Sequence, residues 1–374
     1  MTDNTLYPNL ILDALRQVRY PGTGKNIVEM DMVEDDMRID GRKVSFSLVF
    51  DKPTDPFIKS VVKAAENAIL TFVGRDVDIV GNINVKTRTA NPSPAEAAPV
   101  LPGVKNIIGV SSGKGGVGKS TVAANLAVAL AREGYKVGLL DADIFGPSVP
   151  KMFGIEDEQL YMHEVDGRNL IIPIERYGVK LLSIGLLVDP SKAVLWRGSM
   201  ASIALKQLIE QADWGELDYF LIDMPPGTSD IHLTLVQTLG ITGAIVVTTP
   251  QEVALADARK GVAMFREPKI NVPVLGVVDN MAWFTPELHP DERYYIFGND
   301  EAVDKMAKEY NVPVLASIPI VAAVGDHNDT GRPIALEDSI TAAAFAHLAH
   351  EVIDAVDTRN NQLPPTVKVD VSKK

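Results

Sequence analysis

Seven short apolar runs in the second, larger part of the chain predict strands that are buried on both faces. Helical patterns fall between most of these runs, for example at residues 122–130. Repeated alternation of strand and helix predicts a doubly wound α/β domain with a mostly parallel sheet. The predicted strands are residues 106–110, 136–141, 179–184, 219–224, 244–248, 274–279 and 314–318.

A different pattern in residues 1–86 predicts a small, compact α+β domain. Apolar residues alternate with their neighbours over 44–50, which is typical of a half-buried strand. Asp55 is the expected N-cap of a helix, and Pro56 is its expected first residue. The other expected elements are a helix at 8–18 and a closing strand at 77–80 and 83–85.

Prolines among small and polar residues predict a semi-extended linker at residues 87–103. This linker separates the small domain from a large domain that spans 104–357. The polar tail at 358–374 lacks the amphipathic periodicity of a membrane-targeting helix.

Composition and charge narrow the classes of function. The 374 residues have a formal net charge of −13, which argues against non-specific nucleic-acid binding. The chain contains no cysteine, so it supplies neither a disulfide nor a thiolate metal ligand. The first residues are unlike a signal peptide, and no apolar run approaches the roughly 20 residues of a membrane span. We therefore expect a soluble cytoplasmic protein without a membrane or nucleic-acid partner.

A glycine-rich run between the first predicted strand of the large domain and the helical pattern that follows fits G-x-x-x-x-G-K-[ST]. A P-loop needs this context, because its backbone N–H groups and the helix N-terminus together bind phosphate. Lys119 should reach the β- and γ-phosphates of ATP, and the Ser120 hydroxyl should bind Mg²⁺. A glycine-rich turn is the alternative, which the flanking strand and helix disfavour. The expected nucleotide-binding residues are Gly113, Lys114, Gly115, Gly116, Val117, Gly118, Lys119, Ser120 and Thr121.

A second lysine, Lys114, follows the first glycine of this loop. It could neutralise charge on a partner's nucleotide across a dimer interface, as an arginine finger does in trans. A solvated lysine is the alternative. The GKGGVGKST run resembles the deviant P-loop of the MinD/ParA/nitrogenase-iron-protein class, and that resemblance implies ATP-dependent dimerisation.

Carboxylates follow two of the predicted strands, at the edge of the sheet where ligands bind in this fold. We expect Asp143 to position the attacking water and Asp141 to lie in the outer shell of Mg²⁺, although a turn-forming pair is the alternative. Asp223 lies at the end of the predicted strand 219–224 and should hold Mg²⁺ through water. The Pro-Pro-Gly turn that follows should bring the Gly227 N–H near the γ-phosphate.

Two further residues are candidates for contacts with the base. The carboxamide of Asn280 could read the edge of adenine, but an N-cap or turn asparagine is the alternative. Pro319 could pack on the base or could be an ordinary turn proline.

Sequence blocks spread over the large domain resemble the Mrp (ApbC) family of iron–sulfur cluster carrier ATPases. They are DADIFGPSVP at 141–150, WRGSM at 196–200, DMPPGTSD at 223–230, TTPQEVALADARK at 248–260 and DNMAWF at 279–284. The small domain resembles the iron–sulfur assembly domain that is fused to some members. The resemblance implies a homodimeric ATPase whose nucleotide state is coupled to a [4Fe–4S] cluster and to client or scaffold proteins.

The chain departs from that family just after Phe284, where many members have Cys-x-x-Cys. Here residues 285–292 contain Glu287, His289 and Asp291, which could bind a metal weakly or form a solvated acidic loop. The small domain likewise lacks the cysteine often found before its second helix, so a docking or stabilising module is the alternative there.

Two classes of function remain open. One is an ATP-hydrolysing iron–sulfur carrier or assembly factor whose cluster ligands come from elsewhere. The other is a MinD/ParA-like positioning or partition ATPase.

Overall fold

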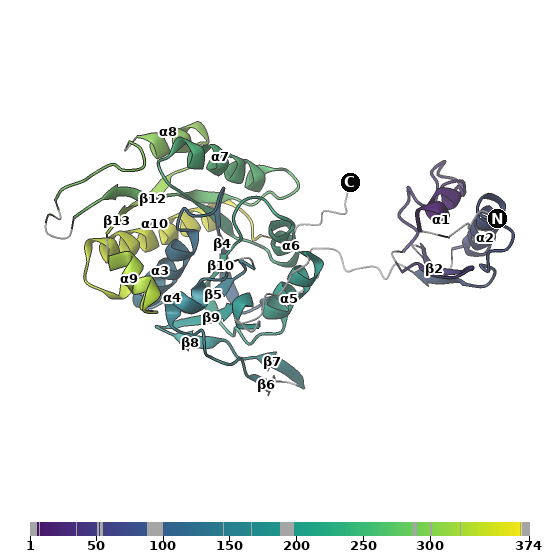
Figure 1. The fold of residues 1–374 in the computed structure, drawn as a ribbon, viewed down its shortest axis with the longest axis horizontal. Helices are drawn as coiled ribbons and strands as arrows, with labels where there is room; N and C mark the ends of the chain where they lie inside the picture. The colour runs from purple at the N-terminus through teal and green to yellow at the C-terminus, as the bar shows by residue number, and fades with distance from the viewer. Residues whose placement is uncertain are drawn as a thin grey trace. The chain divides into compact units, whose positions relative to one another are not determined.

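The computed structural model divides the chain into two compact units, Met1–Ala97 and Ala98–Lys374 (Figure 1). The structure describes residues 6, 8–34, 36–50, 52, 55–87, 100–144, 146–165, 167–187, 198–286, 289, 291–299, 301–321, 323–366 and 368. Most of the predicted linker, part of the WRGSM block, Glu287 and the end of the polar tail lie outside these residues.

The small unit is an α+β structure, as the sequence predicts. Its three strands have the order β1-β2-β3, with β1 antiparallel and β3 parallel to β2. The inward-facing residues of β2, such as Phe46 and Leu48, form a core with Ile69 of the second helix. The elements are α1 (Pro8–Leu15), β1 (Arg38–Asp40), β2 (Lys43–Phe50), α2 (Ile58–Phe72) and β3 (Ile83–Thr87).

Three expectations for this unit are wrong in detail. Helix α1 ends at Leu15, since Val18 accepts a backbone hydrogen bond from Ile27 and the chain turns back there. Helix α2 begins at Ile58, and the Asp55 carboxylate instead accepts a hydrogen bond from Phe57 N at 2.8 Å, outside the helix. Residues 77–80 form only an isolated bridge, between Asp78 and Lys43.

The large unit is built on an eight-stranded sheet with the order β13-β12-β11-β4-β10-β5-β9-β8. All neighbouring strands are parallel except β8, which runs antiparallel to β9. The predicted doubly wound α/β fold is therefore confirmed. The strands of this sheet are β4 (Val104–Ser112), β5 (Val137–Asp141), β8 (Ile174–Arg176), β9 (Val179–Ser183), β10 (Leu217–Asp223), β11 (Gly243–Thr248), β12 (Val274–Phe284) and β13 (Val314–Ile320).

Helices cover both faces of the sheet (Figure 1). Successive side chains of a strand point to opposite faces, so Phe220 packs with one helical layer and Leu221 with the other. The first layer comprises α5 (Gly198–Glu210), α6 (Asp230–Thr238), α7 (Glu252–Arg266) and α8 (Ala302–Glu309). The second comprises α3 (Lys119–Arg132), α4 (Val149–Phe153) and α10 (Ile340–Gln362).

The sequence pattern does not predict the short peripheral elements. The hairpin of β6 (Met162–Val165) and β7 (Arg168–Ile171) lies outside the main sheet. Two short 3₁₀ helices and α9 (Ala323–Asp329) complete the unit. None of the helices in the described part of the chain is both long enough and apolar enough to cross a bilayer.

Candidate functional site

The glycine-rich loop joins β4 to α3 at the carboxyl edge of the sheet. Gly116 and Gly118 have positive φ angles of 82° and 79°, which favour glycine. A Cβ on Gly118 would also lie 2.2 Å from Nδ2 of Asn280. A Cβ on Gly113 would lie 2.1 Å from the carbonyl carbon of Asp257 in α7. Glycine is therefore required at these positions by conformation or by close packing.

Lys119, the first residue of α3, points into a cluster of acidic and hydroxyl groups. Its Nζ lies 2.5 Å from Asp223 Oδ1 and 3.7 Å from Asp143 Oδ2, and it donates to Ser120 Oγ at 3.2 Å. The lysine and both aspartates are buried. The structure thus brings together the lysine, the serine and two of the three aspartates that the sequence predicts.

Asp223 ends β10 and is fully buried, so desolvation raises the pKa of its carboxyl group. The Lys119 ammonium and the Ser120 hydroxyl act in the opposite direction and lower that pKa. Its Oδ2 has no hydrogen-bond partner among the described residues, although it is buried. Carboxylate and hydroxyl oxygens are ligands that Mg²⁺ prefers. An acceptor oxygen without a partner beside Ser120 fits the expected Mg²⁺ site.

Asp141 is held differently from the expected outer-shell ligand. It lies opposite Asp223 in the register of β5 and β10. Its carboxylate accepts hydrogen bonds from Asp143 N at 3.1 Å, Val149 N at 3.3 Å and Ser183 Oγ at 2.9 Å. Burial first, and the charge of Asp223 second, raise its pKa to about 8. In this structure Asp141 fixes the segment that leads to α4.

Gly227 also has a partner that the sequence does not predict. Its N–H donates to Ser112 O at 2.9 Å, so the amide is engaged by the end of β4. Its φ of 78° shows that the turn requires a left-handed residue. The expected contact with a γ-phosphate therefore requires this hydrogen bond to break.

Lys114 is half-buried, and its ammonium has no hydrogen-bond or ion-pair partner among the described residues. Its backbone carbonyl accepts a hydrogen bond from Ser112 Oγ at 3.0 Å. The backbone of this residue is therefore fixed, whereas none of the described residues neutralises the charge of its side chain.

Asn280 contacts the P-loop, and Pro319 follows the residue of β13 with which Asn280 is paired. Nδ2 of Asn280 donates to Val117 O at 2.8 Å, so this residue braces the loop. It is paired in register with Ile318, the residue before Pro319. Pro319 lies inside β13, and so the expectation that it follows the strand is wrong. A proline is tolerated there because β13 is an edge strand.

His232, which no sequence motif predicted, is buried beside the P-loop strand. Its Nδ1 accepts a hydrogen bond from Ser229 N at 3.2 Å, and its Nε2 lies 3.5 Å from Ser111 Oγ. Burial, and to a smaller extent the nearby Lys119 charge, lower the pKa of this imidazole to about 4, although the hydrogen bond with the Ser229 backbone opposes the shift. A polar residue three positions after a serine at the start of a helix is the local signal that could have identified it.

The described residues of the loop after β12 form no metal site. His289 is 64% exposed in its side chain, and its Nδ1 lies 3.8 Å from Glu292 Oε1. No group of three or more histidine and acidic residues that could hold a metal is found among the described residues. Glu287 lies outside them.

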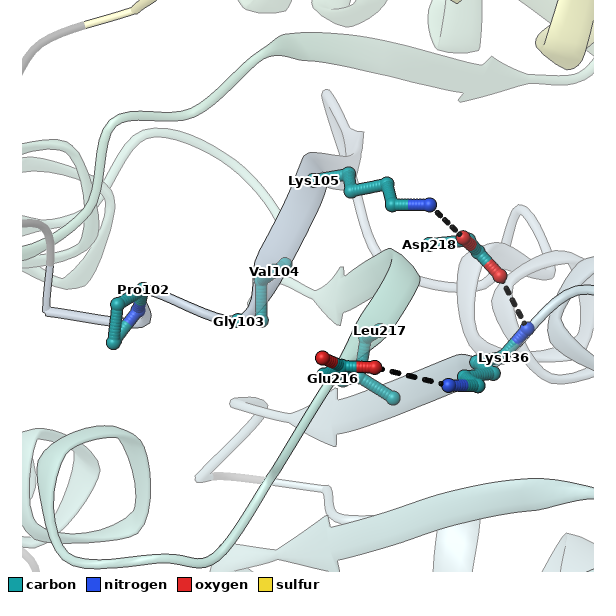
Figure 2. Close-up of a pocket in the computed structure, with 8 residues that line it drawn as sticks. All are labelled: Pro102, Gly103, Val104, Lys105, Lys136, Glu216, Leu217 and Asp218. Atoms are coloured by element: carbon teal, nitrogen blue, oxygen red, sulfur yellow. Dashed lines mark hydrogen bonds and ion pairs between the residues drawn. The ribbon is translucent and has the colours of Figure 1, made fainter.

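A shallow pocket lies at the opposite edge of the sheet, where β4, β5 and β10 begin (Figure 2). Its charged groups neutralise one another: Lys105 pairs with Asp218 at 2.8 Å, and Lys136 pairs with Glu216 at 3.2 Å. The Lys136 N–H also donates to Asp218 at 2.9 Å. This pocket is separated by the length of the strands from the P-loop and presents no unpaired group to a ligand.

Comparison with known proteins assigns the large unit. The family model described as NUBPL iron-transfer P-loop NTPase matches residues 103–353. The chain belongs to this family. A second model, described as iron-sulfur cluster assembly protein, matches residues 9–80, within the small unit. The resemblance inferred from the motifs is thereby confirmed.

At least one relative extends over both units. The iron-sulfur cluster carrier protein of Synechocystis sp. is 41% identical over 359 residues, which are 94% of this chain and 98% of that protein. The iron-sulfur cluster transfer protein NUBPL of Dictyostelium discoideum is 43% identical over 264 residues, 70% of this chain and 80% of its own.

A solved structure supports the fold of the NTPase unit. The nucleotide-binding protein of Archaeoglobus fulgidus in complex with ADP is 38% identical and aligns with a TM-score of 0.55. The alignment covers 64% of this chain and 91% of the archaeal chain.

Proposed function

We propose that this protein is an ATP-binding and ATP-hydrolysing iron–sulfur cluster carrier or assembly factor that acts as a nucleotide-switched homodimer. The observation that supports this most directly is the buried cluster of Lys119, Ser120, Asp143 and Asp223 at the P-loop. Membership of the iron-transfer NTPase family favours a carrier over a positioning or partition ATPase.

The ammonium of Lys119 is the group that changes partners when ATP binds. In this structure it neutralises the buried carboxylates of Asp223 and Asp143. The triphosphate supplies a denser negative charge at the mouth of the loop, so Lys119 moves onto the β- and γ-phosphates. Asp223 and Asp143 then lose their counter-ion and become free for their own roles.

The released acidic groups have separate tasks. Ser120 and Asp223 would hold Mg²⁺, which when bound neutralises charge on the β- and γ-phosphates. Asp143 orients the attacking water, since it lies at the same edge of the sheet with its carboxylate partly accessible. Asp141 keeps Asp143 in place through its hydrogen bond to the Asp143 N–H. It would belong to the outer shell of the metal only indirectly.

Two groups would extend the site. The uncompensated charge of Lys114 suits contact with a nucleotide held by a second copy of the chain, where it would stabilise the transferring phosphoryl group. Asn280 keeps one carboxamide oxygen for the base, since its nitrogen is used by Val117. Pro319 lies next to it in register and would pack on the same base.

The cluster is cargo for which this chain offers no thiolate. The sequence contains no cysteine, and histidine only occasionally replaces cysteine at iron–sulfur centres. We propose that client or scaffold proteins, or a small thiol, complete the ligation. The named relatives are carriers and transfer proteins, which fits a transient cargo.

The test of nucleotide binding is the variant Lys119→Ala, with Lys260→Ala on the exposed face of α7 as control. The Lys119 variant should lose ATP binding, because the Lys119 ammonium is the cation that lies beside Asp143 and Asp223 at the site, whereas the control should bind like wild type. A titration with a fluorescent ATP analogue measures both. Wild-type binding and hydrolysis by the Lys119 variant would refute the assignment of the site.

The test of dimerisation uses Asp143→Ala and Lys114→Ala. The first should bind ATP, hydrolyse it slowly and accumulate as a dimer; the second should lose hydrolysis while retaining binding. Sedimentation at saturating ATP measures the oligomeric state. A monomeric Asp143 variant under those conditions would rule out a shared active site.

A further inference from the structure

The segment that joins β10 to α6, residues 224–229, is fixed at both of its ends and is here called the switch segment. At its start, Met224 N donates to Val110 O at 3.0 Å. In its middle, Gly227 N donates to Ser112 O at 2.9 Å. At its end, Ser229 is the N-cap of α6 and is held by the side chain of His232. The first two attachments are made to Val110 and Ser112 of β4, and the third reaches Ser111 of the same strand through His232.

His232 makes the third attachment through both nitrogens of its ring. Nδ1 accepts from the Ser229 N–H at 3.2 Å, and Nε2 lies 3.5 Å from Ser111 Oγ. The residue is 1% exposed, and its ring meets that of Phe265 of α7 edge-on at 6.5 Å between centroids. The ring is thus held in one orientation by packing as well as by hydrogen bonds.

The charge state of His232 suits this bridge. Because burial lowers its pKa to about 4, the imidazole is neutral at physiological pH and has a single N–H. Since Nδ1 accepts a hydrogen bond from Ser229, the hydrogen-bond network assigns the proton to Nε2. The Nε2–H is then available to the Ser111 hydroxyl. A neutral ring also avoids placing a second positive charge near Lys119.

We propose that His232 is a positioning residue that couples the switch segment to the P-loop strand. It holds Ser229 against Ser111, so that rearrangement on ATP binding is confined to residues 225–228. This inference rests on the proposed ATPase function. With Met224 and Ser229 both fixed, the Gly227 amide has a short path from the Ser112 carbonyl to a phosphate. Its left-handed φ of 78° supplies the hinge.

The alternative role of His232 is only to cap α6, and two variants separate the roles. His232→Asn retains a short acceptor for the Ser229 N–H but does not extend to Ser111. Ser111→Ala removes the other partner of the bridge and leaves both residues of the α6 cap, Ser229 and His232, in place. The exposed His347→Asn on α10 is the matched control.

Steady-state kinetics is the first readout. Each of the two variants should lower kcat about 10-fold with nucleotide affinity changed by less than about 2-fold, because the ground-state contacts of the P-loop remain. The double variant should show the same loss of about 10-fold, since both substitutions break one connection. A wild-type kcat in either single variant, or a multiplicative loss of about 100-fold in the double variant, would overturn the coupling.

Amide hydrogen exchange of the full-length, nucleotide-free protein is the second readout and does not depend on catalysis. Both single variants should accelerate exchange of the Ser229 amide about 10-fold and leave that of Met224 unchanged. Unchanged exchange at Ser229 in the Ser111 variant would also overturn the proposal. If wild-type protein failed to hydrolyse ATP, the proposed function would fall, while exchange would still decide the role of His232.

Discussion

Replacement of Asp279 by asparagine should change how the stability of the large unit depends on pH. Asp279 lies in β12, is 5% exposed, and has a buried Oδ1 without a partner among the described residues. Burial, with a smaller contribution from the charge of Asp304, raises the pKa of its carboxyl group to about 7, although a hydrogen bond from Ser317 opposes the shift. The nearly isosteric Asp279→Asn removes the charge with little change in volume.

The sign follows from proton binding. In the folded protein Asp279 retains its proton up to about pH 7, whereas in the unfolded chain it releases the proton near its ordinary pKa of 3.8. The folded state therefore binds more protons between these values, and the stability of wild type falls as pH rises through this window. Above the folded pKa the loss is complete. Asparagine does not titrate, so the variant lacks this contribution.

The size of this stability change follows from the distance between the unfolded and the folded pKa of Asp279. From about pH 4.5 to about pH 7 the interval is about 2.5 pH units. The free energy of unfolding of wild type falls by about 1.36 kcal/mol for each of these units, or by about 3 kcal/mol in total. Relative to wild type, Asp279→Asn should gain about this much free energy of unfolding between about pH 4.5 and about pH 8.

Urea denaturation followed by tryptophan fluorescence measures this change at both pH values. The three tryptophans, Trp196, Trp214 and Trp283, all lie in the large unit, so the signal reports on it alone. Nucleotide must be absent, because a bound ligand would add its own stabilisation. A difference between variant and wild type that is the same at both pH values would refute the reasoning.

Asp218→Asn is a control of opposite sign in the same unit. Hydrogen bonds from Lys105 and from the Lys136 backbone lower the pKa of Asp218, and both contacts are visible in Figure 2. A carboxyl group with a lowered folded pKa stabilises the protein above its unfolded pKa. Asp218→Asn should therefore lose stability at neutral pH and lose less as the pH falls.

Two further predictions concern the loop and the cargo. Gly118→Ala should weaken ATP binding at least about 10-fold, because its φ of 79° is left-handed and its Cβ would lie 2.2 Å from Asn280 Nδ2. Gly325→Ala in α9, outside the loop and with no atom within 4 Å of its Cβ, should bind ATP normally in the same titration. Anaerobic reconstitution of the isolated, thiol-free protein with iron and sulfide should yield no stable [4Fe–4S] cluster, since the chain has no cysteine. Stoichiometric iron and acid-labile sulfide would contradict this, and His289→Ala would then show whether the loop after β12 is responsible.

Local sequence patterns predicted most of the fold. Buried parallel strands are continuous apolar runs, so β4, β5, β9, β10, β11, β12 and β13 could be located before their neighbours were known. The errors fall at element ends and edges. Asp55 and Pro56 have the local signals of a helix start, but the helix begins at Ile58. Tertiary contacts can override such signals, because a cap contributes only about 1 kcal/mol.

The sequence by itself determined which residues could form a phosphate loop, because glycine spacing and a strand–loop–helix order are local properties. Only the tertiary structure decided what those residues contact. Lys119 meets Asp143 and Asp223 because β4, β5 and β10 lie side by side in the sheet, which no local pattern encodes. The engagement of Gly227 by Ser112 and the bridge made by His232 likewise depend on which strand lies beside the switch segment. Burial then sets the charge state of these groups, since desolvation is a property of the whole fold.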